Sequence, residues 1–302
     1  MRALLAVVLV LTVAACGGGG GDPRPAAPAG DERAPLRIGT KNFTEQFILG
    51  ELYAQALKAK GFPVELKPNV GSSEITHQAL TGGALDMYPE YVGVLLSEVA
   101  NDRSRPSDAS GAYATAKAFE ERSGFTLLGM TPFSDANALA VTPAYARRHS
   151  LRDISDLSRV QGTVRIGAPP EFRTRFEGLV GLQQRYGLHN ARAVPMAIGA
   201  QYAALQAGKV DVATIFTTAG QLADSKLVLL RDPRGVFGTQ HVAPVISRRA
   251  LTAFGPRLAA VIDRVSSRLT AAAMRRMNAA VDLRGRKPDA VADEFLRAQR
   301  LK

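Results

Sequence analysis

Short apolar runs alternate with longer amphipathic stretches along most of this chain. The run at 36–39 predicts a first strand. Ile48, Leu52 and Ala56 then share one face of a helix, which we expect Thr44 to cap. Gly61 is typical of the position at which such a helix stops.

Further strands are expected wherever a short apolar run lies between turn residues. These runs are 64–66, 85–88, 125–129, 138–142, 163–167, 193–198, 210–216, 226–230 and 242–247. Helices, among them 73–80, lie between most of them, and the tail at 249–302 is helical throughout. The alternation predicts an α/β protein with largely parallel sheets.

One pattern occurs twice in the chain. Residues 79–87 and 204–212 both read Ala-Leu-x-x-Gly-x-apolar-Asp-apolar, which is typical of a helix end followed by a short strand. Two copies predict two similar α/β lobes, although such a turn also arises twice by chance. Asp86 and Asp211, the repeated carboxylates, could pair as acid and base in an enzyme. An aspartate that caps a local turn is the simpler interpretation.

The first 35 residues have the composition of an export signal followed by a linker. Residues 3–15 are apolar apart from Thr12, too short for a bilayer core of about 30 Å, and end at Ala15-Cys16. This junction is similar to a bacterial lipobox, so we expect a lipoprotein signal peptide at 1–16, with lipid on Cys16, and a disordered tether at 17–35. The protein would then be extracytoplasmic, anchored by lipid to the outer face of the cell membrane. A free buried cysteine is the alternative.

Charge and composition narrow the possible partners. The formal net charge is +11, and the stretch 246–302 is the most basic part of the chain. A basic tail is compatible with nucleic acid, but in an exported protein a solvated helical face or an anionic membrane surface is the better interpretation, and no nucleic-acid partner is expected.

The chain also lacks the usual signatures of enzymes and metal proteins. One cysteine and four scattered histidines argue against a disulfide framework and a metal site, and no cofactor is expected. The motifs HExxH, GxSxG, SxxK and GxxxxGK[ST] are absent from the sequence, so no enzymatic activity is expected.

Four segments carry a family resemblance: 40–50, 85–93, 210–221 and 241–245. In order and spacing they resemble the glycine betaine/carnitine/choline (osmoprotectant) substrate-binding lipoproteins of ABC transporters. The resemblance implies a type II periplasmic-binding-protein fold with a ligand cleft between two lobes, 36–134 plus 242–302 and 135–241. It also implies capture of a quaternary ammonium solute and its delivery to permease and ATPase subunits.

The resemblance further implies which residues bind the ligand. They are Lys41, Tyr91, Asp135, Asn137, Arg175, Phe216 and Gln240. Glycine betaine joins a carboxylate to a trimethylammonium group, which has no N–H and is held by aromatic faces. Lys41 and Arg175 would hold the carboxylate. We expect Arg175 to matter more, because a guanidinium binds a carboxylate through two parallel hydrogen bonds.

The implied cage around the cation departs from the family pattern. Tyr91 and Phe216 keep aromatic rings of the cage and Asp135 keeps its acidic side chain. Asn137 and Gln240 stand where relatives have tyrosines. Two lost aromatic faces, at about 0.5–2 kcal/mol each, weaken cation binding. Buried amides that a trimethylammonium leaves unsatisfied cost about 1–3 kcal/mol more.

We therefore expect weak binding of simple trimethylammonium solutes, or preference for a related one, within the quaternary ammonium class. Two alternatives stay open. One is the same fold with another carboxylated or polar solute, such as an amino acid, a betaine-like thiol or an aromatic anion. The other is a sensor domain without transport partners.

Overall fold

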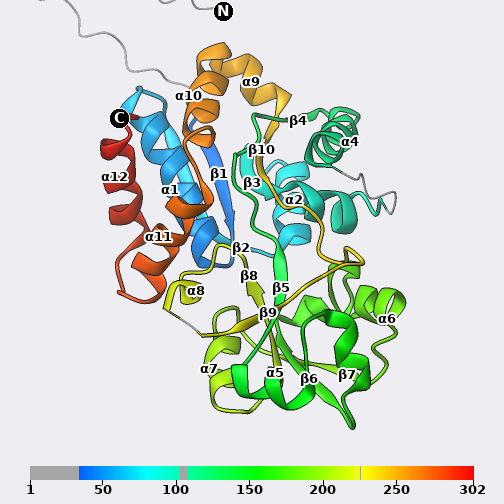
Figure 1. The fold of residues 1–302 in the computed structure, drawn as a ribbon. Helices are drawn as coiled ribbons and strands as arrows, with labels where there is room; N and C mark the ends of the chain where they lie inside the picture. Colours follow the sequence, from blue (N-terminus) through cyan, green and yellow to red (C-terminus); the bar gives the residue numbers. More distant parts are fainter. Residues whose placement is uncertain (1–33, 103–107, 225) are drawn as a thin grey trace, which may run out of the picture. The chain divides into compact units, whose positions relative to one another are not determined.

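The computed structural model describes residues 34–102, 108–224 and 226–302 (Figure 1). Cys16, the signal peptide and the tether expected before residue 34 lie outside the described residues. No helix in the described ranges combines the length and the apolar composition that crossing a membrane requires.

The described residues contain two five-stranded sheets with the same topology. The first has the order β2-β1-β3-β10-β4 and the second the order β7-β6-β8-β5-β9. In each, three neighbouring strands are parallel, and β10 or β5 runs antiparallel to the strands on both sides of it. The strands of the first sheet are β1 (Leu36–Lys41), β2 (Val64–Gly71), β3 (Met87–Tyr91), β4 (Phe125–Leu127) and β10 (Val242–Ser247). Those of the second are β5 (Asn137–Val141), β6 (Val164–Ala168), β7 (Ala191–Pro195), β8 (Val212–Phe216) and β9 (Val228–Leu230).

The repeated aspartates occupy equivalent places in the two sheets. Arg37 donates to Asp86 from its backbone N (3.0 Å), Nε (2.9 Å) and Nη2 (2.9 Å). Arg165 donates to Asp211 from the same three atoms, at 2.8, 3.0 and 2.8 Å. The repeated aspartate therefore has the same role in both sheets. It lies at the start of one strand and binds an arginine of the adjacent parallel strand. An acid–base pair of Asp86 and Asp211 is wrong because each lies in its own sheet.

Both faces of each sheet are covered by helices (Figure 1). One face of the first sheet packs against helices from both ends of the described chain, and the other against α2 and α4. The helices around the first sheet are α1 (Thr44–Ala59), α2 (Ser73–Thr81), α3 (Val92–Val94), η1 (Leu95–Val99), α4 (Ala109–Glu121), α9 (Arg248–Phe254), α10 (Pro256–Ser266), α11 (Ala271–Asp282) and α12 (Pro288–Ala298). Those around the second are α5 (Pro143–His149), η2 (Ile154–Arg159), η3 (Pro170–Arg173), η4 (Phe176–Val180), α6 (Gly181–Tyr186), α7 (Ala200–Gln206) and α8 (Gln221–Asp224).

The first helix agrees with its predicted pattern except at its cap. Ile48, Leu52 and Ala56 are fully buried, as the periodicity requires. Thr44 is the first residue of α1 instead of its cap, and Phe43 occupies the cap position without a side-chain hydrogen bond. The Thr44 hydroxyl donates instead to Asp282 at 2.6 Å, in α11. The expectation that Thr44 caps this helix is therefore wrong.

Other boundaries shift by a few residues. The strand expected at 85–88 is β3, which begins at Met87, after Asp86 has accepted the bonds from Arg37. The strand expected at 193–198 is β7, which ends at Pro195. The helical tail is present as expected, as α9 to α12.

The chain passes between the sheets in two neighbouring segments, 128–136 and 231–241. The backbone N of Asp135 donates to the carbonyl of Gln240 at 2.9 Å, and the N of Gln240 donates to Ser134 Oγ at 2.9 Å. Ser134 and His241 also form an antiparallel bridge. The two passages therefore run side by side where they leave the first sheet.

Candidate functional site

All seven residues expected at the ligand site line a single cavity. It has a volume of about 60 Å³ and is bounded by both sheets. Lys41, Tyr91 and Phe216 end β1, β3 and β8, the carboxyl edge at which open α/β sheets bind ligands. Asn137 begins β5, directly opposite Phe216 in register. Asp135 and Gln240 come from the two passages between the sheets, and Arg175 lies between η3 and η4.

In this conformation the cavity is tight. Its volume corresponds to about four to six water molecules at roughly 10–15 Å³ each.

Three aromatic rings form a stack along one wall. The ring of Phe43 lies between its two neighbours, with its centroid 6.1 Å from that of Tyr91 and 5.3 Å from that of Phe216. Both pairs are near parallel, with interplanar angles of 24° and 14°. Ring faces attract a cation that has no hydrogen to donate, and a guest would share them with Lys41 Nζ, which lies 4.2 Å from the Tyr91 centroid and 5.8 Å from that of Phe43. Phe43 adds an aromatic ring that the family pattern did not point to.

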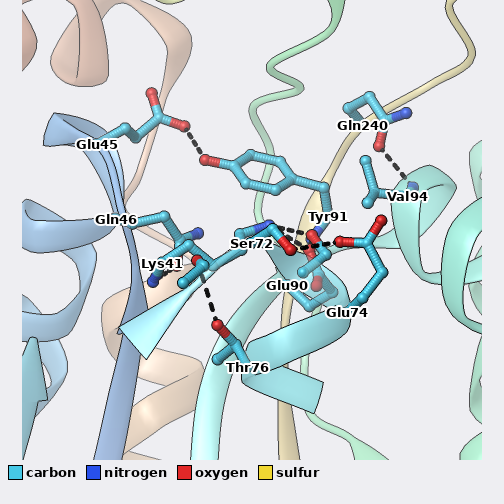
Figure 2. A network of polar contacts seen from close by, with 12 residues as sticks. Lys41, Glu45, Gln46, Ser72, Glu74, Thr76, Glu90, Tyr91, Val94 and Gln240 are labelled. Carbon is cyan, nitrogen blue, oxygen red and sulfur yellow. Dashed lines mark hydrogen bonds and ion pairs between the residues drawn. The ribbon is translucent and has the colours of Figure 1, made fainter. Parts of the chain in front are cut away.

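Two buried carboxylates lie behind the stack. Asp135 is 4% exposed and accepts from the backbone N of Thr218 at 3.1 Å. Glu45 is 3% exposed and accepts from the Tyr91 hydroxyl and from Asn278 Nδ2, both at 2.8 Å (Figure 2). Neither carboxylate forms an ion pair with a basic side chain of the described residues.

The electrostatics of this pair favour a positive guest. Burial, and then the charge of Glu45, raise the pKa of Asp135 well above its ordinary value. Burial also raises the pKa of Glu45, against the hydrogen bonds from Thr218, Asn278 and Tyr91. Two buried acids without an ion pair are costly to ionise, although the charge of Lys41 lowers the pKa of Glu45, and a bound cation would reduce that cost.

Lys41 is already paired. Its ammonium binds the carboxylate of Glu90, donates to Ser73 Oγ at 3.1 Å and stands 4.2 Å from the centroid of the Tyr91 ring (Figure 2). Burial lowers the pKa of Lys41, and the charge of Glu90 opposes that shift. The lysine expected to hold a ligand carboxylate therefore holds a protein carboxylate in this structure.

Arg175 is paired in the same way, across the cleft. Its Nε donates to Glu74 Oε1 at 3.1 Å and its Nη2 to Glu74 Oε2 at 2.7 Å. Glu74 comes from α2 beside the first sheet, whereas Arg175 follows the second sheet's β6. Burial alone would raise the pKa of Glu74, but the bonds from Arg175 and Ser72 hold it at about 2. Glu74 is therefore ionised at neutral pH.

The amide of Gln240 is satisfied within the protein. Its Oε1 accepts from the backbone N of Val94 at 3.1 Å, and its Nε2 donates to Glu177 (Figure 2). The expectation that this amide would face the ligand unsatisfied is wrong, because both of its ends are bonded. The free-energy cost expected for an unsatisfied Gln240 amide next to a trimethylammonium group therefore does not apply.

Sequence reasoning missed four residues of this site: Phe43, Glu45, Glu74 and Glu177. A signal existed for the first three. Phe43 and Glu45 begin α1 directly after β1, and Glu74 lies in the first turn of α2 directly after β2. Residues at such strand-to-helix junctions face the ligand edge of the sheet, and a helix N-terminus favours a carboxylate. No comparable signal marks Glu177.

Comparison with known proteins places this geometry in a family. The model of the substrate binding domain of ABC-type glycine betaine transport systems matches residues 34–298. The chain belongs to this family. It is a family of solute-binding proteins, and its members serve ABC-type transport systems.

Individual relatives agree with the family match. A glycine-betaine-binding protein of Pseudomonas aeruginosa is 34% identical over 277 residues, which cover 88% of each chain. The glycine betaine-binding protein YehZ of Escherichia coli is 28% identical over 87% of this chain and 90% of its own. A solved structure described as a glycine betaine/carnitine/choline ABC transporter superposes with a TM-score of 0.71 at 26% identity, over 88% of this chain and 99% of its own. The type II periplasmic-binding-protein fold expected from the sequence is thereby confirmed.

Proposed function

We propose that this protein is the extracytoplasmic solute-binding component of an ABC importer. It captures a quaternary ammonium osmoprotectant and delivers it to a permease driven by ATPase subunits. The family match and the fold support the transport role. The choice of solute rests on the cavity itself.

The observation that carries the proposal is the wall formed by Phe43, Tyr91 and Phe216 together with the buried carboxylate of Asp135. Aromatic faces and an acid without a basic partner suit a cation. Aromatic faces also attract a quaternary ammonium group, which has no N–H to donate, and the carboxylate of Asp135 adds the opposite charge.

Titration calorimetry tests the proposal. The panel is choline, glycine betaine, carnitine and proline betaine, with 3,3-dimethyl-1-butanol as the neutral isostere of choline. We expect at least one quaternary ammonium solute to bind, and the neutral isostere to bind at least about tenfold more weakly, because it forfeits both the cation–π and the Asp135 attraction. Binding of an amino acid with none of the quaternary solutes would contradict the proposal.

We further propose that the two sheets are the cores of two lobes that close on the ligand, 36–134 plus 242–302 and 135–241. The paired passages at Ser134–Asp135 and Gln240–His241 would act as the hinge. In support, Glu45 and Asn278 from the first lobe both bind Thr218 from the second. Small-angle scattering should show a smaller radius of gyration with saturating ligand. An unchanged radius despite proven binding would contradict closure.

The proposed anchor is a lipid on Cys16, outside the described residues. We expect Cys16→Ser to abolish lipid attachment and to release the protein from the membrane or leave its signal peptide uncleaved. Mass spectrometry of the N-terminus and membrane fractionation measure both. Unchanged mass and membrane association in the variant would contradict the anchor.

A further inference from the structure

Both basic side chains that line the cavity are neutralised by carboxylates of the protein. Lys41 binds Glu90, and Arg175 binds Glu74. A solute carboxylate therefore finds no cationic side chain with its charge available in this cavity wall. A solute cation, by contrast, finds Asp135 without a basic partner among the described residues.

The Glu74–Arg175 contact has the geometry that a bound carboxylate would adopt. Nε and Nη2 of the guanidinium face the two oxygens of one carboxylate, at 3.1 and 2.7 Å. This parallel two-bond arrangement is the strongest way in which arginine holds a carboxylate. Glu74 thus occupies the Nε–Nη2 edge of Arg175, one of the two edges through which a guanidinium binds a carboxylate.

Two further features keep Glu74 in place. Ser72 Oγ donates to Glu74 Oε2 at 2.6 Å, which orients the carboxylate from its own helix (Figure 2). The side chain of Arg175 is 17% exposed and that of Glu74 is 42% exposed, so the arginine end of the pair is shielded from water and from salt and the glutamate end is not. A competing carboxylate must break both the ion pair and the Ser72 bond before it can bind Arg175.

Other acids near Arg175 oppose the entry of a ligand carboxylate. Glu171 lines the same cavity, and Glu98 Oε2 lies 4.0 Å from Arg175 Nε. If a ligand carboxylate entered while Glu74 remained, three protein carboxylates would surround it, and one guanidinium would be shared among four. Like charges at such range repel, and the repulsion is strongest where water is excluded.

We propose that Glu74 sets the ligand class of this cavity. By holding Arg175 it makes the site select a quaternary ammonium solute without a carboxylate, of which choline is the simplest, over the zwitterion glycine betaine. The inference rests on the proposed function and narrows it. Glu74 acts as a positioning residue, through Arg175.

Glu74→Gln tests the inference, with Glu171→Gln as the matched control. Both substitutions remove one negative charge close to Arg175, but only the Glu74 carboxylate is hydrogen-bonded to its guanidinium, whereas Glu171 accepts from the backbone N of Arg175 through its carbonyl. Calorimetry on choline and glycine betaine gives the ratio of the two dissociation constants for wild type and each variant. Thermal unfolding of the free proteins shows whether the variants are folded.

We expect wild type to bind choline more tightly than glycine betaine. In Glu74→Gln the freed guanidinium should tighten betaine binding at least about tenfold, with choline changed by less than about threefold. Glu171→Gln should shift the betaine-to-choline ratio by less than about threefold, because it frees no donor.

Three results overturn the inference. The first is wild type that binds glycine betaine more tightly than choline; this overturns the inference whether or not Glu74→Gln folds. The second is an unchanged betaine-to-choline ratio of dissociation constants in a folded Glu74→Gln protein. The third is an equal change of this ratio in Glu171→Gln, which would assign the effect to cavity charge alone. In all three the proposed function stands, whereas failure of every quaternary ammonium solute to bind wild type would remove the proposed function itself.

Discussion

Asp135→Asn should move ligand affinity and protein stability in opposite directions. The side chain is 4% exposed and close to buried Glu45, and no basic residue of the described chain neutralises it. Asn keeps an oxygen that can accept from the backbone N of Thr218, removes the charge and replaces the second oxygen by an NH2 group. The substitution therefore tests the electrostatic role of Asp135.

The expected loss of affinity follows from the burial of the pair that forms on binding. Removing one partner of a buried charge pair costs about 2–5 kcal/mol, which is about 30-fold to 5,000-fold in dissociation constant. This range holds for buried charges, and Asp135 is buried. A value at its lower end would indicate that the rings of Phe43, Tyr91 and Phe216 carry most of the binding energy.

The expected gain in stability follows from the direction of the pKa shift. Because burial and Glu45 raise the pKa of Asp135 in the folded state, folding disfavours its ionised form. Above the folded pKa the wild type pays this penalty and the variant does not, so the ligand-free variant unfolds at a higher temperature. The difference should shrink as the pH falls toward about 4, where the unfolded side chain is protonated as well.

Calorimetry of choline binding and thermal unfolding between pH 4 and 8 measure both effects. Asp211→Asn is the matched control, since Asp211 binds Arg165 in the second sheet and does not line the cavity. The control should lose stability and keep its affinity. An Asp135→Asn protein with wild-type affinity, or with lower stability at pH 8, would refute the reasoning.

Three further predictions address other parts of the site. Phe43→Leu keeps the bulk but removes the central ring of the stack, so choline affinity should fall about 2- to 30-fold with little change in unfolding temperature; unchanged affinity in calorimetry would place the cation elsewhere. Cation binding should release up to one proton because it lowers the raised pKa of Asp135, and affinity should rise with pH, by at most about tenfold per unit; equal binding heats in buffers of different ionisation enthalpy would contradict this. A Cβ at Gly220 would stand 2.4–2.8 Å from Ala279 of α11, so Gly220→Ala should weaken ligand binding by opposing closure while both sheets stay folded; wild-type affinity in that variant would remove this contact from the closed form.

The sequence predicted the parts of this protein that depend on local pattern. Each expected strand has a counterpart, with boundaries that differ by up to five residues, and the seven site residues share one cavity. The repeat of 79–87 at 204–212 marked two sheets of the same topology. These features follow from periodicity and from residues close together in the chain.

The partners of the site residues could not be predicted in this way. Glu74 lies 101 positions from Arg175 in the chain, and Gln240 lies 146 positions from Val94. Such contacts depend on how the two sheets approach each other, which neither propensity nor spacing encodes. The expected and the observed site differ most at these contacts, because side chains expected to donate to the ligand donate to acidic residues of the protein instead.

A crystal structure of the complex with choline tests the central claim most directly. We expect the quaternary nitrogen to lie within about 6 Å of the ring centroids of two or more of Phe43, Tyr91 and Phe216, with Asp135 as the nearest carboxylate. Choline bound only in the neighbouring cavity of about 400 Å³, which is lined by Leu96, Ser97 and Phe237, would contradict it.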